Sequence, residues 1–194
     1  MDFMDINKLI ASRVAALREA RDLSLTALAE RSGVSRSNIS LIERGESSAT
    51  ATVLDKLAGA LGVTLASLFE AGDDAPAPPS PFSPAASQPV WTDPGSGYLR
   101  RQLSPAARSP MQLVEVIFPP GQRVAYDQVR READVYQQVW LLEGEMEITA
   151  GEGRWSLAPG DCLAIREDQP ISYANPGTEP ARYLVGLVTL PFTI

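Results

Sequence analysis

Through the first seventy residues, hydrophobic positions recur every three or four residues, which is the period of helices that bury one face. The first run predicts a helix from about residue 6 to residue 21, and later runs predict helices over 25–31, 36–44, 53–61 and 65–69. The apolar stripe of the first helix consists of Ile6, Ile10, Val14 and Leu17. We therefore expect five small helices around one apolar cluster.

The second and third of these helices are joined by a tight turn. Ser24 and Ser35 each precede an apolar run and are suited to cap a helix, because a serine hydroxyl accepts a hydrogen bond from an unpaired backbone N–H of the first turn. Gly33 can adopt the left-handed conformation that ends a helix. In the third helix, Ile39 and Ile42 mark the buried side.

The side opposite these isoleucines carries hydroxyl, amide and guanidinium groups. Such groups on the outer face of a short helix are the ones that read base edges in the major groove of DNA. The alternative is an ordinary helical hairpin whose polar face is only solvated. On the first interpretation, the candidate DNA contacts are Ser24, Thr26, Ser35, Arg36, Ser37, Asn38, Ser40 and Arg44.

Four short motifs follow one another through these two helices: Leu28-Ala29, Gly33-Val34-Ser35, Ile39-Ser40 and Ile42-Glu43-Arg44-Gly45. With these motifs, the chain resembles the lambda-repressor-like, or XRE-type, helix-turn-helix family over about residues 6–70. One departure is Leu25, where the family often carries glutamine. The resemblance implies sequence-specific binding to double-stranded operator DNA, with the first helix of the motif across the backbone and the second in the major groove.

After residue 70 the pattern changes twice. Residues 71–90 are rich in proline and alanine and predict a semi-rigid linker, because proline removes backbone donors and favours extended geometry. Beyond it, short segments rich in β-branched and aromatic residues are separated by turn signals, which predicts a β-sandwich or barrel in residues 91–194. The predicted strands are 113–118, 136–142, 145–150, 154–158, 162–166 and 182–190.

Three turn motifs punctuate this half: Leu142-Glu143-Gly144-Glu145, Pro159-Gly160-Asp161 and Asn175-Pro176-Gly177. With these motifs, it resembles a cupin, a double-stranded β-helix jelly roll, over about residues 97–190. The whole chain resembles bacterial transcription regulators that join a helix-turn-helix to a C-terminal cupin sensor. The expected fold class is therefore α + β and multidomain, with a five-helix lambda-repressor-like domain in 1–70 and a cupin barrel in 91–194.

The cupin resemblance would imply a metal held by three histidines and a glutamate, but the sequence contains no histidine. By position, the glutamate is replaced by Gln137 and the third histidine by Ile171, while the other two fall within 130–133, which reads Arg-Arg-Glu-Ala. An amide, guanidinium groups and an aliphatic side chain do not make a transition-metal site. We expect no metal and no other cofactor.

Two further chemistries remain as alternatives. Asp127, Glu132 and Asp134 could form an oxygen cluster, but they lie in an expected loop, where solvated acids are the simpler interpretation. The sequence offers no histidine base and no arrangement of a nucleophile with a base. Metal-free cupin enzymes would typically still need a catalytic histidine. We expect a protein that is not an enzyme, with a DNA-tethered metal-free cupin enzyme as the less favoured reading.

The remaining role for the barrel interior is binding. By strand alternation, Gln137 points inward together with Val135, Val139 and Leu141, while Tyr136, Gln138 and Trp140 face outward. A mostly apolar interior with one orienting amide is typical of a small-molecule site. The rival hypothesis is a solidly packed barrel that only dimerises. Candidate ligand contacts are Arg123, Gln137, Val139, Leu141, Arg166, Ile171 and Tyr173.

The net charge is −7, but residues 1–70 hold 8 Lys/Arg against 9 Asp/Glu, a net of −1. Phosphate affinity must then come from a few placed arginines, and a homodimer would double those contacts. The single cysteine, Cys162, excludes an intramolecular disulfide and is expected to be packed in the interior. There is no apolar run of the roughly 20 residues that span a bilayer and no basic signal peptide. We expect a cytoplasmic, effector-responsive dimer that acts on operator DNA, as a repressor.

Overall fold

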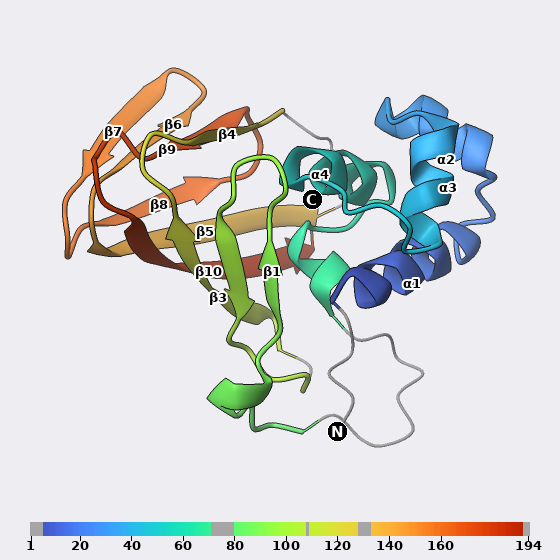
Figure 1. Ribbon diagram of the computed structural model, residues 1–194, viewed down its shortest axis with the longest axis horizontal. Coiled ribbons are helices and arrows are strands. Elements are labelled where there is room, and N and C mark those ends of the chain that lie inside the picture. Colours follow the sequence, from blue (N-terminus) through green and yellow to red (C-terminus); the bar gives the residue numbers. More distant parts are fainter. Residues whose placement is uncertain (1–5, 71–79, 108, 128–132, 192–194) are drawn as a thin grey trace.

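The computed structural model describes residues 6–70, 80–107, 109–127 and 133–191. Its α-helices gather on one side of the molecule and its strands on the other (Figure 1). The linker residues 71–79 and the loop positions 130–132 considered above lie outside the described residues. Within the described ranges, no helix is both long and apolar enough to cross a lipid bilayer.

The predicted helical pattern is confirmed, with one difference at its end. The fifth segment is a 3₁₀ turn rather than an α-helix, since Ser67 N donates to Thr64 O and Leu68 N donates to Leu65 O, each over 3.1 Å and three residues. The elements are α1 (Ile6–Glu19), α2 (Leu25–Ser32), α3 (Arg36–Glu43), α4 (Ala51–Ala60), η1 (Ala66–Phe69) and η2 (Ala85–Ser87).

The predicted caps form as expected. Ser24 Oγ accepts a hydrogen bond from Ala27 N, and Ser35 Oγ accepts one from Asn38 N. Gly33 ends α2 in the left-handed conformation, with φ of 69°. Local sequence therefore sets where both helices of the motif begin and where the first one ends. The apolar cluster that they enclose includes Val14, Leu28, Ile39, Leu54 and Leu57, all fully buried.

The strands form two antiparallel sheets that face each other as a barrel. The larger has the order β1-β2-β3-β10-β5-β8 and the smaller has the order β4-β9-β6-β7. All six predicted strands are present, and four short ones were not predicted. The strands are β1 (Val90–Thr92), β2 (Leu99–Gln102), β3 (Met111–Phe118), β4 (Arg123–Tyr126), β5 (Ala133–Glu143), β6 (Met146–Ala150), β7 (Gly153–Leu157), β8 (Cys162–Arg166), β9 (Ile171–Ala174) and β10 (Ala181–Pro191).

The alternation predicted for β5 is confirmed: Gln137 and Val139 are buried, whereas Tyr136 and Trp140 are exposed. The expectation for Cys162 is wrong, because its side chain is exposed. Cys162 pairs with Trp140 across β8 and β5 and so lies on the same outer face of the sheet.

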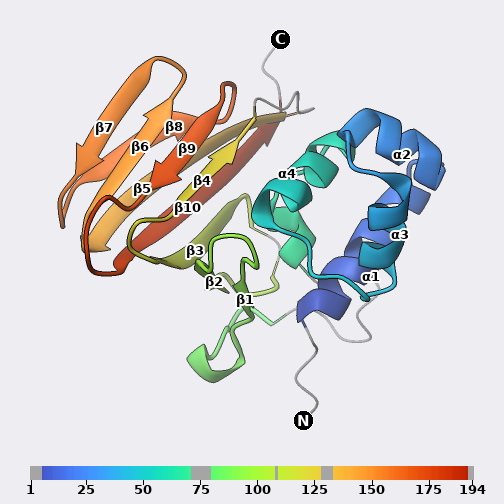
Figure 2. The same cartoon turned by 45° about the horizontal axis from the view of Figure 1, so that its top comes forward.

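The helical domain meets the barrel through α4 and η1. The Phe69 ring of η1 packs edge-on against Trp91 of β1, with 5.4 Å between ring centroids. On α4, Lys56 forms an ion pair of 3.6 Å with Asp127. Figure 2 shows α4 between the barrel and the pair α2 and α3. The third helix therefore lies on the side of the helical domain that faces away from the barrel.

Candidate functional site

The first candidate site is the outer surface of α3. Arg36 and Ser37 are exposed near its N-terminus, and Asn38 is half-buried beside them. At the other end, Arg44 Nη1 donates to Ser40 Oγ over 2.5 Å, and Arg44 Nη2 donates to Glu46 over 2.8 Å. The surface thus presents a row of hydroxyl and amide groups with one guanidinium group at each end, Arg36 and Arg44.

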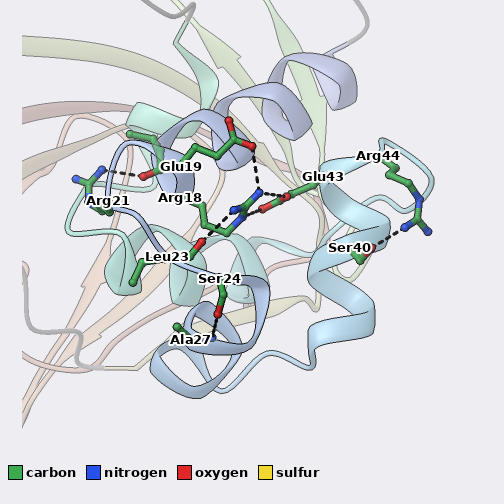
Figure 3. A network of polar contacts seen from close by, with 10 residues as sticks. Arg18, Glu19, Arg21, Leu23, Ser24, Ala27, Ser40, Glu43 and Arg44 are labelled. Carbon is green, nitrogen blue, oxygen red and sulfur yellow. Dashed lines mark hydrogen bonds and ion pairs between the residues drawn. The ribbon is translucent and has the colours of Figure 1, made fainter.

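An ion pair inside the domain fixes the position of α3. Arg18 of α1 donates from Nε and Nη2 to the two carboxylate oxygens of Glu43, over 2.7 and 2.9 Å, and from Nη1 to Leu23 O (Figure 3). Hydrogen bonding to Glu43 is the largest cause that raises the pKa of the Arg18 guanidinium. Because this bidentate pair is shielded from solvent, it anchors the C-terminal end of α3 on α1.

The eight residues predicted to contact DNA lie on α2, on α3 or directly beside them. In two of them, Ser24 and Ser35, the hydroxyl oxygen accepts the hydrogen bond that caps a helix. These two side chains therefore fix where α2 and α3 begin. Sequence reasoning did not assign a partner to Arg18. The sequence feature that could have identified this partner is Glu43 in the Ile42-Glu43-Arg44-Gly45 motif, because its carboxylate lies next to the buried Ile42.

The second candidate site is a cavity of about 90 Å³ inside the barrel. Aromatic and apolar side chains from both sheets form most of its wall, among them Tyr98, Val116 and Tyr173. The helical domain completes it with residues of α4 and of the segment leading into η1. These residues are Asp55, Thr64, Leu65 and Ala66.

Four tyrosines give the cavity its hydroxyl groups. Tyr173 Oη donates to Gln137 Oε1 over 2.8 Å, and the hydroxyls of Tyr98 and Tyr126 share a hydrogen bond of 3.2 Å. Burial raises the pKa of Tyr98 to about 12 and raises the pKa of Tyr126, Tyr173 and Tyr183 well above the usual value. All four hydroxyls are therefore neutral at physiological pH and can donate hydrogen bonds.

The cavity also holds a cation, Arg100 of β2. Its side chain is buried, and its guanidinium carbon lies 4.9 Å from the centre of the Phe69 ring. Neither Nε nor Nη2 has a hydrogen-bond partner within the described parts of the chain. Burial is the main cause that lowers the pKa of this guanidinium, although arginine stays protonated in proteins. Sequence reasoning missed Arg100 because it predicted no strand there.

The residues predicted to contact a ligand divide by position. Gln137, Ile171 and Tyr173 line the cavity. Val139 and Leu141 are fully buried on the same sheet face but are not among the residues that line the cavity.

The two arginines predicted to contact a ligand lie elsewhere. Arg166 is exposed and forms an ion pair with Asp134 on the outer face of β8, over the Tyr136 ring. Arg123 is exposed and donates to Ser172 Oγ on the outside of the smaller sheet. Strand alternation turns both side chains away from the interior, since their neighbours Ile165 and Val124 are the buried residues.

The side chains that could coordinate a metal are not clustered within the described residues. Among the described residues, no group of three or more histidine, cysteine, aspartate or glutamate side chains could hold a metal ion. At the positions where the cupin resemblance places ligands, the wall carries the Gln137 amide and the Ile171 side chain. These donors do not fit a transition metal.

Comparison with known proteins identifies the family of each domain. The helix-turn-helix family matches residues 14–68, and the cupin domain family matches residues 114–187. The HTH-type transcriptional regulator y4dJ of Sinorhizobium fredii is 38% identical over 73 residues, which are 38% of this chain and 95% of that protein. The chain belongs to the XRE-type helix-turn-helix transcriptional regulators.

Two further relatives extend the match of this regulator over both domains. SutR, an HTH-type transcriptional regulator of Escherichia coli strain K12, is 24% identical over 196 residues, covering 92% of this chain and 94% of SutR. The crystal structure of an HTH_3 family transcriptional regulator from Vibrio cholerae is 28% identical, with a TM-score of 0.72 over 96% of this chain and 98% of that one. The regulator thus combines a DNA-binding helix-turn-helix domain with a cupin domain.

Proposed function

We propose that the chain is a cytoplasmic, homodimeric regulator that binds a palindromic operator through α3 and responds to a small effector held in the barrel without a metal. The observation that carries this proposal is the composition of the cavity wall. Asp55 of α4, and Thr64, Leu65 and Ala66 beside η1, line the same cavity as the barrel residues. A molecule bound there would contact both domains at once.

Contact with both domains gives the effector a way to act. A ligand shifts a conformational equilibrium only by its difference in affinity between the two states. A cavity walled by both domains changes shape whenever α4 moves against the barrel, so its affinity depends on the domain arrangement. The volume of about 90 Å³ is smaller than the roughly 150 Å³ cavity that holds benzene, which favours a small metabolite with a handful of non-hydrogen atoms.

The outer face of the larger sheet supplies the proposed dimer contact. Trp140 and Tyr136 of β5 and Leu113 of β3 are each between 36% and 48% exposed. Tyr136 pairs with Val188 of β10, and Val188 pairs with the exposed Met111 of β3, so apolar side chains lie next to one another across three neighbouring strands. Large exposed apolar patches on soluble proteins mark interaction sites. A two-fold dimer would set two recognition helices about 34 Å apart, one turn of DNA.

Binding rather than turnover is the role that the cavity chemistry supports. The tyrosine hydroxyls are protonated at physiological pH and are not bases, and the carboxylates on the wall are engaged, since Asp127 pairs with Lys56 and Asp55 and Glu167 have interaction partners. A barrel that only dimerises would have no need for a cavity holding a buried guanidinium. We therefore favour the hypothesis of an effector-binding regulator over a DNA-tethered enzyme and over a barrel that only dimerises.

The test uses the full chain. Operator duplexes are selected from randomised DNA, and a library of purified metabolites is screened by thermal unfolding with and without MgCl₂ and ZnCl₂. A site-specific ligand raises Tm with dose because it binds only the folded protein. The proposal predicts a metal-independent compound that also changes operator affinity. Stabilisation by the metals alone would overturn the metal-free site, and no effect of any compound would favour the purely dimerising barrel.

A further inference from the structure

Among the residues that line the cavity, Arg100 has buried hydrogen-bond donors without an acceptor in the described parts of the chain. It is 8% exposed, and its Nε and Nη2 atoms are both without a hydrogen bond among the described residues. Burying a charged donor without a partner is unfavourable, so native proteins retain such a group where a further partner compensates for it. The Phe69 ring covers the flat face of the guanidinium but cannot accept from its N–H edge.

The two unpartnered atoms have a defined geometry. Nε and the neighbouring Nη2 donate in the same direction along one edge of the guanidinium. This edge matches the two oxygens of a carboxylate, which accepts both bonds side by side. Among the described residues, no acidic side chain on the cavity wall accepts a hydrogen bond from these two atoms. Burial lowers the pKa of the Arg100 guanidinium, and the negative charge of Glu167 raises it without such a bond. Asp55 has an interaction partner of its own, and Asp127 pairs with Lys56.

We propose that the effector is a small organic carboxylate whose two oxygens accept hydrogen bonds from Nε and Nη2 of Arg100. This inference rests on the effector role proposed above and names the chemical class of the effector. The apolar part of the molecule would lie against Val116, Val185 and Leu187, which also line the cavity. Further donors on the cavity wall are the hydroxyl of Tyr183 and one hydroxyl of the hydrogen-bonded pair Tyr98 and Tyr126, since the proton of Tyr173 is donated to Gln137.

The same residue connects the carboxylate to the DNA-binding domain. The Arg100 guanidinium lies against Phe69 of η1, so any shift that the carboxylate imposes on Arg100 is transmitted to the helical domain. Phe69 in turn packs against Trp91 of β1. Arg100 is therefore both the proposed anion contact and a contact between the two domains.

The experiment measures thermal unfolding of the full chain with three probes of similar size and different charge: butyrate, butyramide and butylammonium, at constant ionic strength. Three variants accompany the wild type. Arg100→Met removes the charge but keeps an unbranched side chain of similar length, and Arg100→Lys keeps the charge but loses the paired donors. Arg101→Met is the matched control, because Arg101 is the next residue on β2 and pairs with Glu115 instead.

Butyrate is expected to raise the Tm of the wild type and of Arg101→Met with dose, whereas butyramide and butylammonium do not. Arg100→Lys should bind butyrate roughly 10- to 100-fold more weakly, since hydrogen bonds to charged groups are lost. Arg100→Met should lose the butyrate response. Without any probe it should unfold at a higher temperature than the wild type, because an unpaired buried charge is replaced by an apolar group.

Several results would overturn the inference. One is an equal response to butyramide or butylammonium, and another is a butyrate response that survives in Arg100→Met. A lower Tm of probe-free Arg100→Met would assign Arg100 a purely structural role through Phe69. If a neutral metabolite of the library stabilised the chain while butyrate did not, the carboxylate would be wrong and the effector role would stand. If neither butyrate nor any metabolite bound, both would fail together.

Discussion

Asp93 joins the barrel to the first turn of α4 through a single buried hydrogen bond. The residue follows β1 and is 2% exposed. Its Oδ1 accepts from the backbone N–H of Ala51, the first residue of α4, over 2.8 Å. Its Oδ2 accepts from the N and Oγ of Ser96, over 2.8 and 2.6 Å. The first N–H groups of a helix have no partner within the helix, so Asp93→Ala would leave that of Ala51 unsatisfied.

The expected loss follows from these contacts. Removing a charged acceptor from a buried donor costs about 1.5–3 kcal/mol. The attraction between a carboxylate and a helix N-terminus contributes about 0.3–1 kcal/mol more. Asp93→Ala should therefore lower the free energy of unfolding by about 2–4 kcal/mol. With a urea m value of about 2 kcal/mol per molar, the unfolding midpoint falls by about 1–2 M.

Two probes of urea unfolding separate the domains. All three tryptophans follow residue 90, so their fluorescence reports on the barrel, whereas circular dichroism at 222 nm is dominated by the helices of the N-terminal domain. We expect the two transitions of the wild type to coincide, since the domains share buried contacts. In Asp93→Ala the circular dichroism transition should move to lower urea than the fluorescence transition.

Ser96→Ala is the matched control. It removes a local hydrogen bond to Asp93 and leaves the bond to Ala51 in place, so its two transitions should still coincide. The reasoning would be refuted if Asp93→Ala lowered the midpoint no further than Ser96→Ala and kept both transitions together.

Three further predictions concern the DNA surface, its support and the dimer face. Arg36→Ala should weaken binding to a selected operator about tenfold and should reduce the slope of log Kd against log salt concentration by about one. The slope is measured at several NaCl concentrations. An unchanged slope would mean that Arg36 does not contact phosphate. Arg18→Met leaves the partly buried Glu43 carboxylate unpaired and should destabilise the helical domain by about 1.5–3 kcal/mol in urea unfolding followed by circular dichroism, whereas an unchanged midpoint would contradict the anchoring role. Trp140→Glu should turn the dimer into a monomer in sedimentation equilibrium, while Trp155→Glu on the smaller sheet should not; two identical profiles would place the dimer contact elsewhere.

Local signals predicted the parts of the fold that depend on neighbouring residues. Serine caps, a left-handed glycine and a 3.6-residue apolar period were enough for α1 to α4. The alternation along β5 was enough to place Gln137 inside and Trp140 outside. These signals are set by backbone and solvent preferences within a few residues and do not require knowledge of the tertiary structure.

Signals that depend on distant residues were out of reach. The strand β2 reads Leu-Arg-Arg-Gln, in which no apolar alternation is visible, because its buried side carries Arg100 and Gln102. The hydrogen bond between Asp93 and Ala51 joins residues 42 positions apart. The arginines predicted to contact a ligand were Arg123 and Arg166, but their strands turn both side chains outward.

The most direct test of the account is the affinity of the full chain for its selected operator, measured by fluorescence anisotropy of a labelled duplex. The titration is made without additions and with the library metabolite that raises Tm most, for the wild type and for Asp93→Ala. The account predicts that the metabolite changes the wild-type Kd by about 5- to 150-fold, in the range of ordinary allosteric coupling, and that the change shrinks in Asp93→Ala. A wild-type Kd that is the same with and without the bound metabolite would contradict a cavity that controls DNA binding.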